Sequence, residues 1–154
     1  MGYAATFGAE ARIADFVETI APGAFADSLR SGGDVLALVD HDPSALLART
    51  KTGTLRLHED DRGLAFEIAL PDTTLGRDVL AMAERGDLGG MSFGFLVKDE
   101  QWQGRRRELR ALDLLEVSVV HAWPAYDGTA VDARNRTPRL NRARRLIEVM
   151  KWTG

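Results

Sequence analysis

The sequence predicts one mainly β domain, flanked by about three helices and closed or nearly closed into a barrel. Short apolar stretches, several of which alternate with polar residues, recur from the N-terminus to about residue 120 and are typical of strands. Helical patterns are confined to three segments with Pro, Thr or Gly near their ends. The length of 154 residues fits a single domain. We expect the barrel over residues 1–135 and a C-terminal helix over residues 136–154.

The strands follow from apolar runs and from alternation. We expect them at 3–7, 34–40, 53–57, 63–70, 91–97 and 114–120. The segments 53–57 and 63–70 flank the turn HEDDRG and predict a hairpin. Between the last two strands, the polar stretch 98–110, with RRR at 105–107, is expected to be a loop.

Three segments predict helices. Residues 22–33 have Pro22 near the start and glycines at the end, and residues 73–86 run from a threonine cap to Gly86. Residues 137–152 also start at a threonine cap. Their apolar residues recur at helical spacing and predict one apolar face, formed by Leu140, Ala143, Ile147 and Met150.

The composition excludes several classes of function. The net charge is −3, which gives no overall attraction to nucleic acid or to anionic lipid. The chain has no cysteine, so disulfides, thiolate metal sites and cysteine nucleophiles are excluded. No apolar stretch approaches the 18 or so residues of a membrane helix, and the N-terminus lacks a signal-peptide pattern. We therefore expect a soluble protein without a membrane partner.

The chain has three histidines. His58 lies in a charged turn and is expected to be solvated, and His121 is best interpreted as the end of a strand. His41 follows an apolar strand directly, with a carboxylate on each side. A rigid strand end is a good place for a catalytic base, but a turn residue before Pro43 is an equally good interpretation.

Ser92 and Glu116 each allow two interpretations. Alternation places Ser92 beside Gly94, away from the bulky side chains of its strand, so Ser92 is either a turn residue or a nucleophile with room for another chain to approach. In 114–120, simple alternation puts Leu115 on the face of Val117 and Val119, and Glu116 with Ser118 on the other. Because a carboxylate within an apolar strand needs a partner, Glu116 forms either a structural ion pair with an arginine or a bond that orients a histidine.

Six segments, in order, carry a resemblance to a known family. They are IAPGAFADSL (20–29), LVDHD (38–42), RTKTGTLRLHEDDRGLAFEIALPDT (49–73), GGMSFGF (89–95), LLEVSVV (114–120) and PAYDGTAV (124–131). Over about residues 3 to 131 they resemble the prohead (capsid maturation) protease family of tailed phages, which is similar in fold to the herpesvirus assemblins. The resemblance implies an assemblin-like β-barrel, a serine endopeptidase activity and no cofactor or metal.

Roles for individual residues are implied by the same motifs. His41 corresponds to the general base, Ser92 to the nucleophile and Glu116 to the third member. The assemblins have a histidine in that third place, so Glu116 departs from that branch. Backbone N–H groups of Ala125 or Tyr126 would stabilise the oxyanion.

A second candidate for the oxyanion donors is the pair Gly89 and Gly90, which precedes Ser92 in the sequence. Substrates implied by the family are the scaffold segment of the major capsid protein and the protease itself, cleaved inside the assembling prohead in the host bacterial cytoplasm. The particle would be a phage or a gene-transfer agent, and the protease a homodimer.

Two other functions remain open at this stage. One is a non-catalytic, capsid-associated scaffolding module with the same fold. The other is a metal-dependent hydrolase using His41, Asp42 and His121, for which no HExxH-like spacing is present. The six arginines between 134 and 145 either contact acidic scaffold or nucleic acid, or form the solvated side of the last helix, which we favour.

Overall fold

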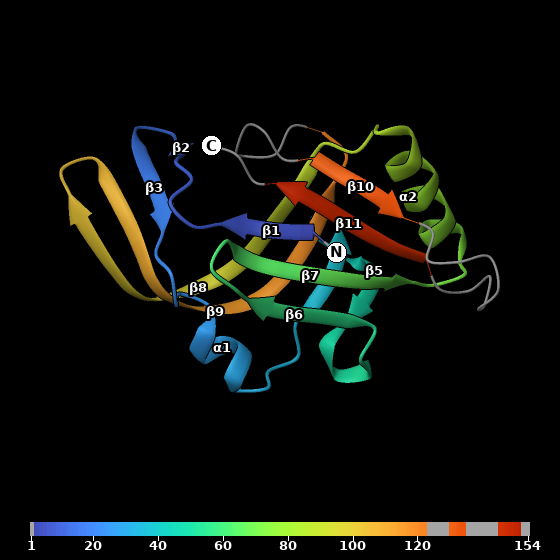
Figure 1. Cartoon of the computed structure of the whole chain (residues 1–154), viewed down its shortest axis with the longest axis horizontal. Coiled ribbons are helices and arrows are strands. Elements are labelled where there is room, and N and C mark those ends of the chain that lie inside the picture. Colours follow the sequence, from blue (N-terminus) through green and yellow to red (C-terminus); the bar gives the residue numbers. More distant parts are fainter. Residues whose placement is uncertain (1, 123–129, 135–144, 152–154) are drawn as a thin grey trace.

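A computed structural model gives the fold of residues 2–122 and the backbone of 130–134 and 145–151. The chain is mainly β, with two sheets and two α-helices in these residues (Figure 1). The elements are β1 (Gly2–Thr6), β2 (Ala11–Ile13), β3 (Phe16–Ile20), α1 (Ala26–Arg30), β4 (Leu36–Val39), β5 (Asp42–Arg49), the 3-10 turn η1 (Thr50–Thr52), β6 (Leu55–Glu59), β7 (Gly63–Leu70), α2 (Thr74–Arg85), β8 (Gly90–Gln103), β9 (Arg106–Val120), β10 (Ala130–Arg134) and β11 (Arg145–Lys151).

The first sheet is built on β7. This strand pairs with β6 in an antiparallel hairpin, as the sequence predicts, and with β1 and β11 through its first and second halves. Strand β10 continues the sheet beyond β11. The side chain of Asp60 closes the β6–β7 turn by accepting the N–H groups of Arg62 and Gly63 at 2.8 and 3.1 Å.

The second sheet is built on β9, the longest strand, and contains the residues of the candidate site. Strand β8 runs antiparallel to β9 over its whole length. Strands β3 and β4 are parallel to β9 and pair with its two ends. Strand β5 follows β4 and completes the sheet.

Between the stretches of β9 that pair with β3 and with β4, the segment around α1 provides the hydrogen-bond partners of β9. Ala21 N–H donates to the Leu109 carbonyl at 2.9 Å, and Leu112 N–H donates to the Ala24 carbonyl at 3.1 Å. Further along, Leu114 N–H donates to the hydroxyl of Ser28 at 2.8 Å. The helix predicted over 22–33 is thus reduced to the short α1, while the helix predicted over 73–86 is confirmed as α2.

One hydrophobic core joins the two sheets. Strand β7 contributes Phe66 and Ile68, and strands β8 and β9 contribute Met91 and Val117, all of them buried. Phe25 from the α1 segment packs edge-on against Phe93 of β8, with ring centroids 5.7 Å apart. In Figure 1 the β8–β9 hairpin passes behind the first sheet and extends beyond it beside β2 and β3.

Several predicted elements differ from the structure. The stretch 98–110 is not a loop, because β8 and β9 continue through it to a short turn at Gly104 and Arg105. Arg107 is bonded to Glu18 at 3.0 Å and to Glu100 at 2.5 Å, and these ion pairs allow a polar sequence to form strands.

The C-terminal helix predicted over 136–154 is wrong where the structure describes it. Residues 145–151 form β11, which pairs with the part of β7 that extends beyond β1. The sequence RLIEVMK has polar residues at every third position, which suits a helix, but it contains β-branched Ile147 and Val149, which favour a strand. The remainder of the predicted helix lies outside the described residues.

Among the described strands, neither sheet closes on itself, so the barrel stays a prediction. No helix within the described part of the chain is long and apolar enough to cross a membrane.

Candidate active site

His41 lies in a tight turn between β4 and β5. Val39 and Asp42 pair across the turn, which leaves Asp40 and His41 as its two central residues. Both have positive φ, 48° and 59°, and two positive φ values are the signature of a type I′ hairpin turn. Asp40 N–H donates to the Val119 carbonyl at 2.9 Å, so this turn is attached to the end of β9.

The imidazole of His41 contacts Glu116 of β9. The Nδ1 atom lies 2.5 Å from Glu116 Oε1, and the two side chains are 47% and 13% exposed. The nearly buried carboxylate of Glu116 therefore has the partner that its apolar strand requires. Of the two interpretations for Glu116, the bond to a histidine is the one present in the structure.

Ser118 bridges the base and the carboxylate. Its fully buried hydroxyl donates to Glu116 Oε2 at 2.5 Å and accepts the backbone N–H of His41 at 3.1 Å. It therefore fixes the carboxylate and the backbone of the turn with one side chain. The sequence contained a signal for this role, because alternation places Ser118 on the same face as Glu116.

A β-bulge at Leu115 turns Glu116 outward. Gly94 pairs with Glu116 and Phe95 with Leu114, so Leu115 is an extra residue on β9. The side chain of Leu114 is buried, whereas Leu115 is 48% exposed. The predicted grouping of Leu115 with the core residue Val117 is therefore wrong, since the bulge shifts the alternation by one residue.

Ser92 lies on β8, beside these residues. It pairs in register with Ser118, and Gly94 pairs with Glu116, so the serine and the carboxylate project from the same face of adjacent strands. Gly94 provides space for the carboxylate, since a Cβ atom there would lie 2.6 Å from Glu116 Oε1. The structure thus joins His41 to Glu116 directly and places Ser92 on the neighbouring strand.

A second histidine–carboxylate pair lies at the same end of the sheet. His121 follows the end of β9, and its Nδ1 atom lies 2.6 Å from Asp40 Oδ2, while its N–H donates to Asp40 Oδ1 at 2.9 Å. Burial acts to raise the pKa of Asp40, but the hydrogen bonds from His121 outweigh it and lower that pKa. Asp40 therefore links the turn that carries His41 to the chain that leaves β9.

Gly89 allows this outgoing chain to pass close to the start of β8. A Cβ atom at Gly89 would lie 1.7 Å from the Ala122 carbonyl oxygen. The Gly89 N–H donates to the Val120 carbonyl at 2.8 Å, and an amide used in this way is a poor candidate for an oxyanion donor. The other candidates, Ala125 and Tyr126, lie outside the described residues.

The remaining candidates are placed away from this cluster or outside the described chain. His58 is exposed on β6, and residues 2–122 contain no group of three side chains that could hold a metal ion. Asp42 bonds Ser44, at 2.7 Å to its hydroxyl. Of the arginine-rich segment from 134 to 145, only the backbone of its two ends, in β10 and β11, is described.

A histidine held by a carboxylate, with a serine on the adjacent strand, is the set of groups that serine hydrolases use. The sequence matches the family described as caudovirus prohead serine protease over residues 1–142. The chain belongs to this family of serine peptidases, which act in the maturation of tailed phages. No curated protein and no solved structure matches the chain.

Proposed function

We propose that the chain is a serine endopeptidase with Ser92 as nucleophile, His41 as general base and Glu116 as the group that orients the imidazole. The observation that carries this proposal is the 2.5 Å contact between His41 Nδ1 and Glu116 Oε1, on the strand that pairs with the strand of Ser92. A carboxylate on one ring nitrogen holds the imidazole in place and stabilises the imidazolium that forms during the reaction.

The proton path follows from this contact. With Nδ1 bound to Glu116, Nε2 is the ring nitrogen that accepts the proton of the Ser92 hydroxyl. The Ser92 oxygen attacks the peptide carbonyl, and the imidazolium then gives its proton to the leaving amine. Water, activated by the same histidine, hydrolyses the acyl-enzyme and restores the hydroxyl.

The substrates that we propose follow from the family. They are the scaffold segment of the major capsid protein and the protease chain itself, cleaved inside the assembling prohead in the host cell. A phage and a gene-transfer agent would both need this step. A homodimer belongs to the same proposal, and sedimentation of the purified protein tests it.

The reactive residues can be tested with purified variants. We expect Ser92→Ala and His41→Ala each to abolish cleavage of the capsid precursor and of the chain itself, while both variants keep the circular dichroism of the native fold. A fluorophosphonate probe should label the native chain on Ser92 only. Cleavage by purified Ser92→Ala would show that Ser92 is not the nucleophile.

The alternative function is a non-catalytic scaffolding module. It predicts that the native chain is not labelled by the probe and that particles assembled with Ser92→Ala show unchanged processing. Glu116 favours the peptidase, because a module without chemistry has no need for a carboxylate bonded to a half-exposed histidine.

A further inference from the structure

A small apolar patch lies on the sheet face that carries the candidate site. It is formed by Leu96 of β8 and Leu115 of β9 and is called here the Leu96–Leu115 patch. These side chains are 59% and 48% exposed, although leucine is among the residues most often buried. Met91 and Phe93, on the opposite face of the same hairpin, are buried in the core.

Strand geometry places this patch next to Ser92. Ser92, Gly94 and Leu96 are alternate residues of β8, and alternate residues of a strand share a face. Leu115 is the extra residue of the bulge opposite Gly94, directly before Glu116. Val97 is also exposed, at 39%, but belongs to the opposite face with Phe93 and Phe95.

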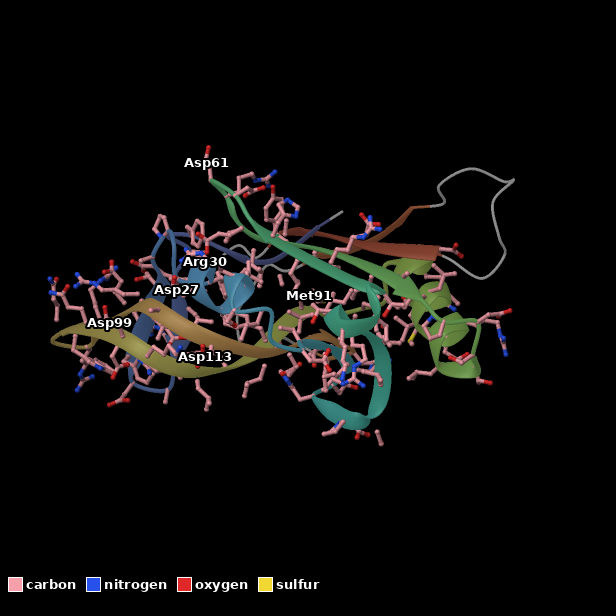
Figure 2. All side chains as sticks on the ribbon, turned by 90° about the horizontal axis from the view of Figure 1, so that it is seen from below. Asp27, Arg30, Asp61, Met91, Asp99 and Asp113 are labelled. Atoms are coloured by element: carbon pink, nitrogen blue, oxygen red, sulfur yellow. The ribbon has the colours of Figure 1, made fainter. Side chains whose placement is uncertain are left out.

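Charged side chains lie on both sides of the Leu96–Leu115 patch. Asp113 pairs in register with Leu96, and its carboxylate lies 2.9 Å from Lys98 Nζ; Figure 2 labels Asp113 on this hairpin. On the other side lies Glu116, which bonds His41. The Leu96–Leu115 patch therefore lies between the Asp113–Lys98 ion pair and the candidate site.

We propose that the Leu96–Leu115 patch binds an apolar side chain of the substrate polypeptide, two or four residues away from the residue whose carbonyl is attacked. This inference rests on the proposed function. The substrate is the occupant that the structure favours, because the bond to be cleaved has to reach Ser92 on the same face. The residues next to that bond then lie within reach of the two leucines.

The spacing follows from the geometry of extended chains. A strand rises about 3.3 Å per residue, so Gly94, opposite Leu115, lies about 7 Å along β8 from Ser92, and Leu96 lies about 13 Å from it. An extended substrate running along β8 has the same repeat. If the residue whose carbonyl is attacked lies at Ser92, the side chains two and four residues away from that residue lie above Leu115 and Leu96.

The test is digestion of a random decapeptide library, with the new termini identified by mass spectrometry. The native enzyme should enrich large apolar residues over serine about tenfold at a position two or four residues away from the residue whose carbonyl is attacked, as expected for apolar contacts. The double variant Leu96→Ser/Leu115→Ser should lose this enrichment. Val97→Ser, which alters the opposite face of the same strand, should keep it.

Separate outcomes distinguish the two proposals. If the library is not cut, or is cut equally by Ser92→Ala, the proposed function fails and this inference fails with it. If cutting depends on Ser92 but shows no apolar preference at these positions, or if the double variant keeps the preference, only the inference fails.

A further control addresses folding and association. The double variant should still be labelled by the fluorophosphonate probe at the native rate, because its substitutions are at exposed positions. The double variant could instead change the molecular mass of the purified protein in solution while keeping the native cleavage pattern. That result would identify the patch as a contact between copies of the chain, and the proposal would be wrong.

Discussion

At the scale of single residues, the backbone of His41 is held in a conformation that side chains disfavour. Residues with a side chain lose about 1–2 kcal/mol in the left-handed region, and glycine is the residue best suited to the second central position of a type I′ turn. His41 has φ 59° at that position. Its N–H donates to the Ser118 hydroxyl at 3.1 Å, a bond that helps to hold the turn. We interpret the positive φ of His41 as local backbone strain that the fold tolerates because this position places the imidazole next to Glu116.

This strain can be measured by comparing two substitutions of the same residue. His41→Gly and His41→Ala both remove the contact with Glu116, but only glycine also relieves the positive φ. We expect His41→Gly to be about 1 kcal/mol more stable than His41→Ala in urea denaturation, and both to be inactive. Equal stability of the two variants would show that the turn is not strained.

Gly94 offers a second residue-scale prediction. A methyl group at this position would lie 2.6 Å from Glu116 Oε1, so Gly94→Ala has to displace the carboxylate that holds the imidazole. We expect at least a tenfold loss of kcat for peptide cleavage, with a smaller change in KM, since Glu116 acts through the base in the proposed mechanism.

The matched control is Gly33→Ala, where the nearest atom to the new methyl group lies at 3.8 Å. This variant should keep native kcat. If Gly94→Ala also keeps native kcat while remaining folded, then the position of Glu116 does not control the reaction.

The candidate site could be predicted only in part from the sequence. Alternation places Ser92 on the roomy face of its strand, and an acidic residue within apolar LLEVSVV needs a partner. The contact between His41 and Glu116 joins residues 75 positions apart, and such a distance is set by strand pairing. The bond between Asp40 and His121 could not be predicted for the same reason.

At the scale of elements, α1 controls the shape of β9. The strand has a β-bulge at Leu115, and the residue before the bulge donates its N–H to the hydroxyl of Ser28 at 2.8 Å. Both ends of this hydrogen bond are buried. A helix that does not carry reactive groups therefore fixes the strand residue from which Glu116 projects.

Ser28→Ala tests this control. The substitution leaves the buried N–H of Leu114 without an acceptor, which costs about 1–3 kcal/mol. We expect a corresponding loss in the free energy of unfolding and faster hydrogen exchange of the Leu114 amide. Ser31→Ala, which removes a hydroxyl that donates to the Ser28 carbonyl at the residue following α1, should change both measurements little.

Helices and strands can be predicted from the sequence where a single pattern, such as alternation or a pair of helix caps, is present. Alternation predicts the β6–β7 hairpin, and the threonine cap and Gly86 predict α2, in which Thr73 accepts the Gly76 N–H at 3.1 Å. The strands of 98–110 were missed because their polar residues bond one another across the β8–β9 hairpin and bond Glu18 of β3, so that they do not need a loop. The C-terminal segment was assigned to the wrong class because its apolar residues recur at helical spacing, whereas pairing with β7, which is distant in sequence, makes residues 145–151 a strand.

At the scale of the whole molecule, carboxylates make stability depend on pH. A hydrogen bond from the Tyr3 hydroxyl, 2.6 Å away, lowers the pKa of Asp60. Hydrogen bonding to Arg49 lowers the pKa of Asp34. A carboxyl group whose pKa is lower in the folded than in the unfolded chain stabilises the fold fully above its unfolded value, near pH 4, and loses this contribution as pH falls through the folded value.

We therefore expect the urea midpoint to be steady near neutral pH and to fall steeply below about pH 4. Asp60→Asn should be less stable than the native chain at pH 7, with the difference shrinking as the pH is lowered. Asp61→Asn is the control, because Asp61 points away from the molecule at the end of the β6–β7 hairpin in Figure 2. A difference for Asp60→Asn that stays constant with pH would contradict the assignment.

The parallel pairing of β4 with β9 has a consequence for the timing of synthesis. The backbone N–H of His41 is bonded to a hydroxyl 77 residues later in the chain, and its ring to a carboxylate on the same late strand. A ribosome that has released the chain only as far as β8 exposes the imidazole without either of these two partners. If His41 is the base, as proposed, peptidase activity should arise only once β9 has been synthesised, and a nascent chain should not cut its neighbours.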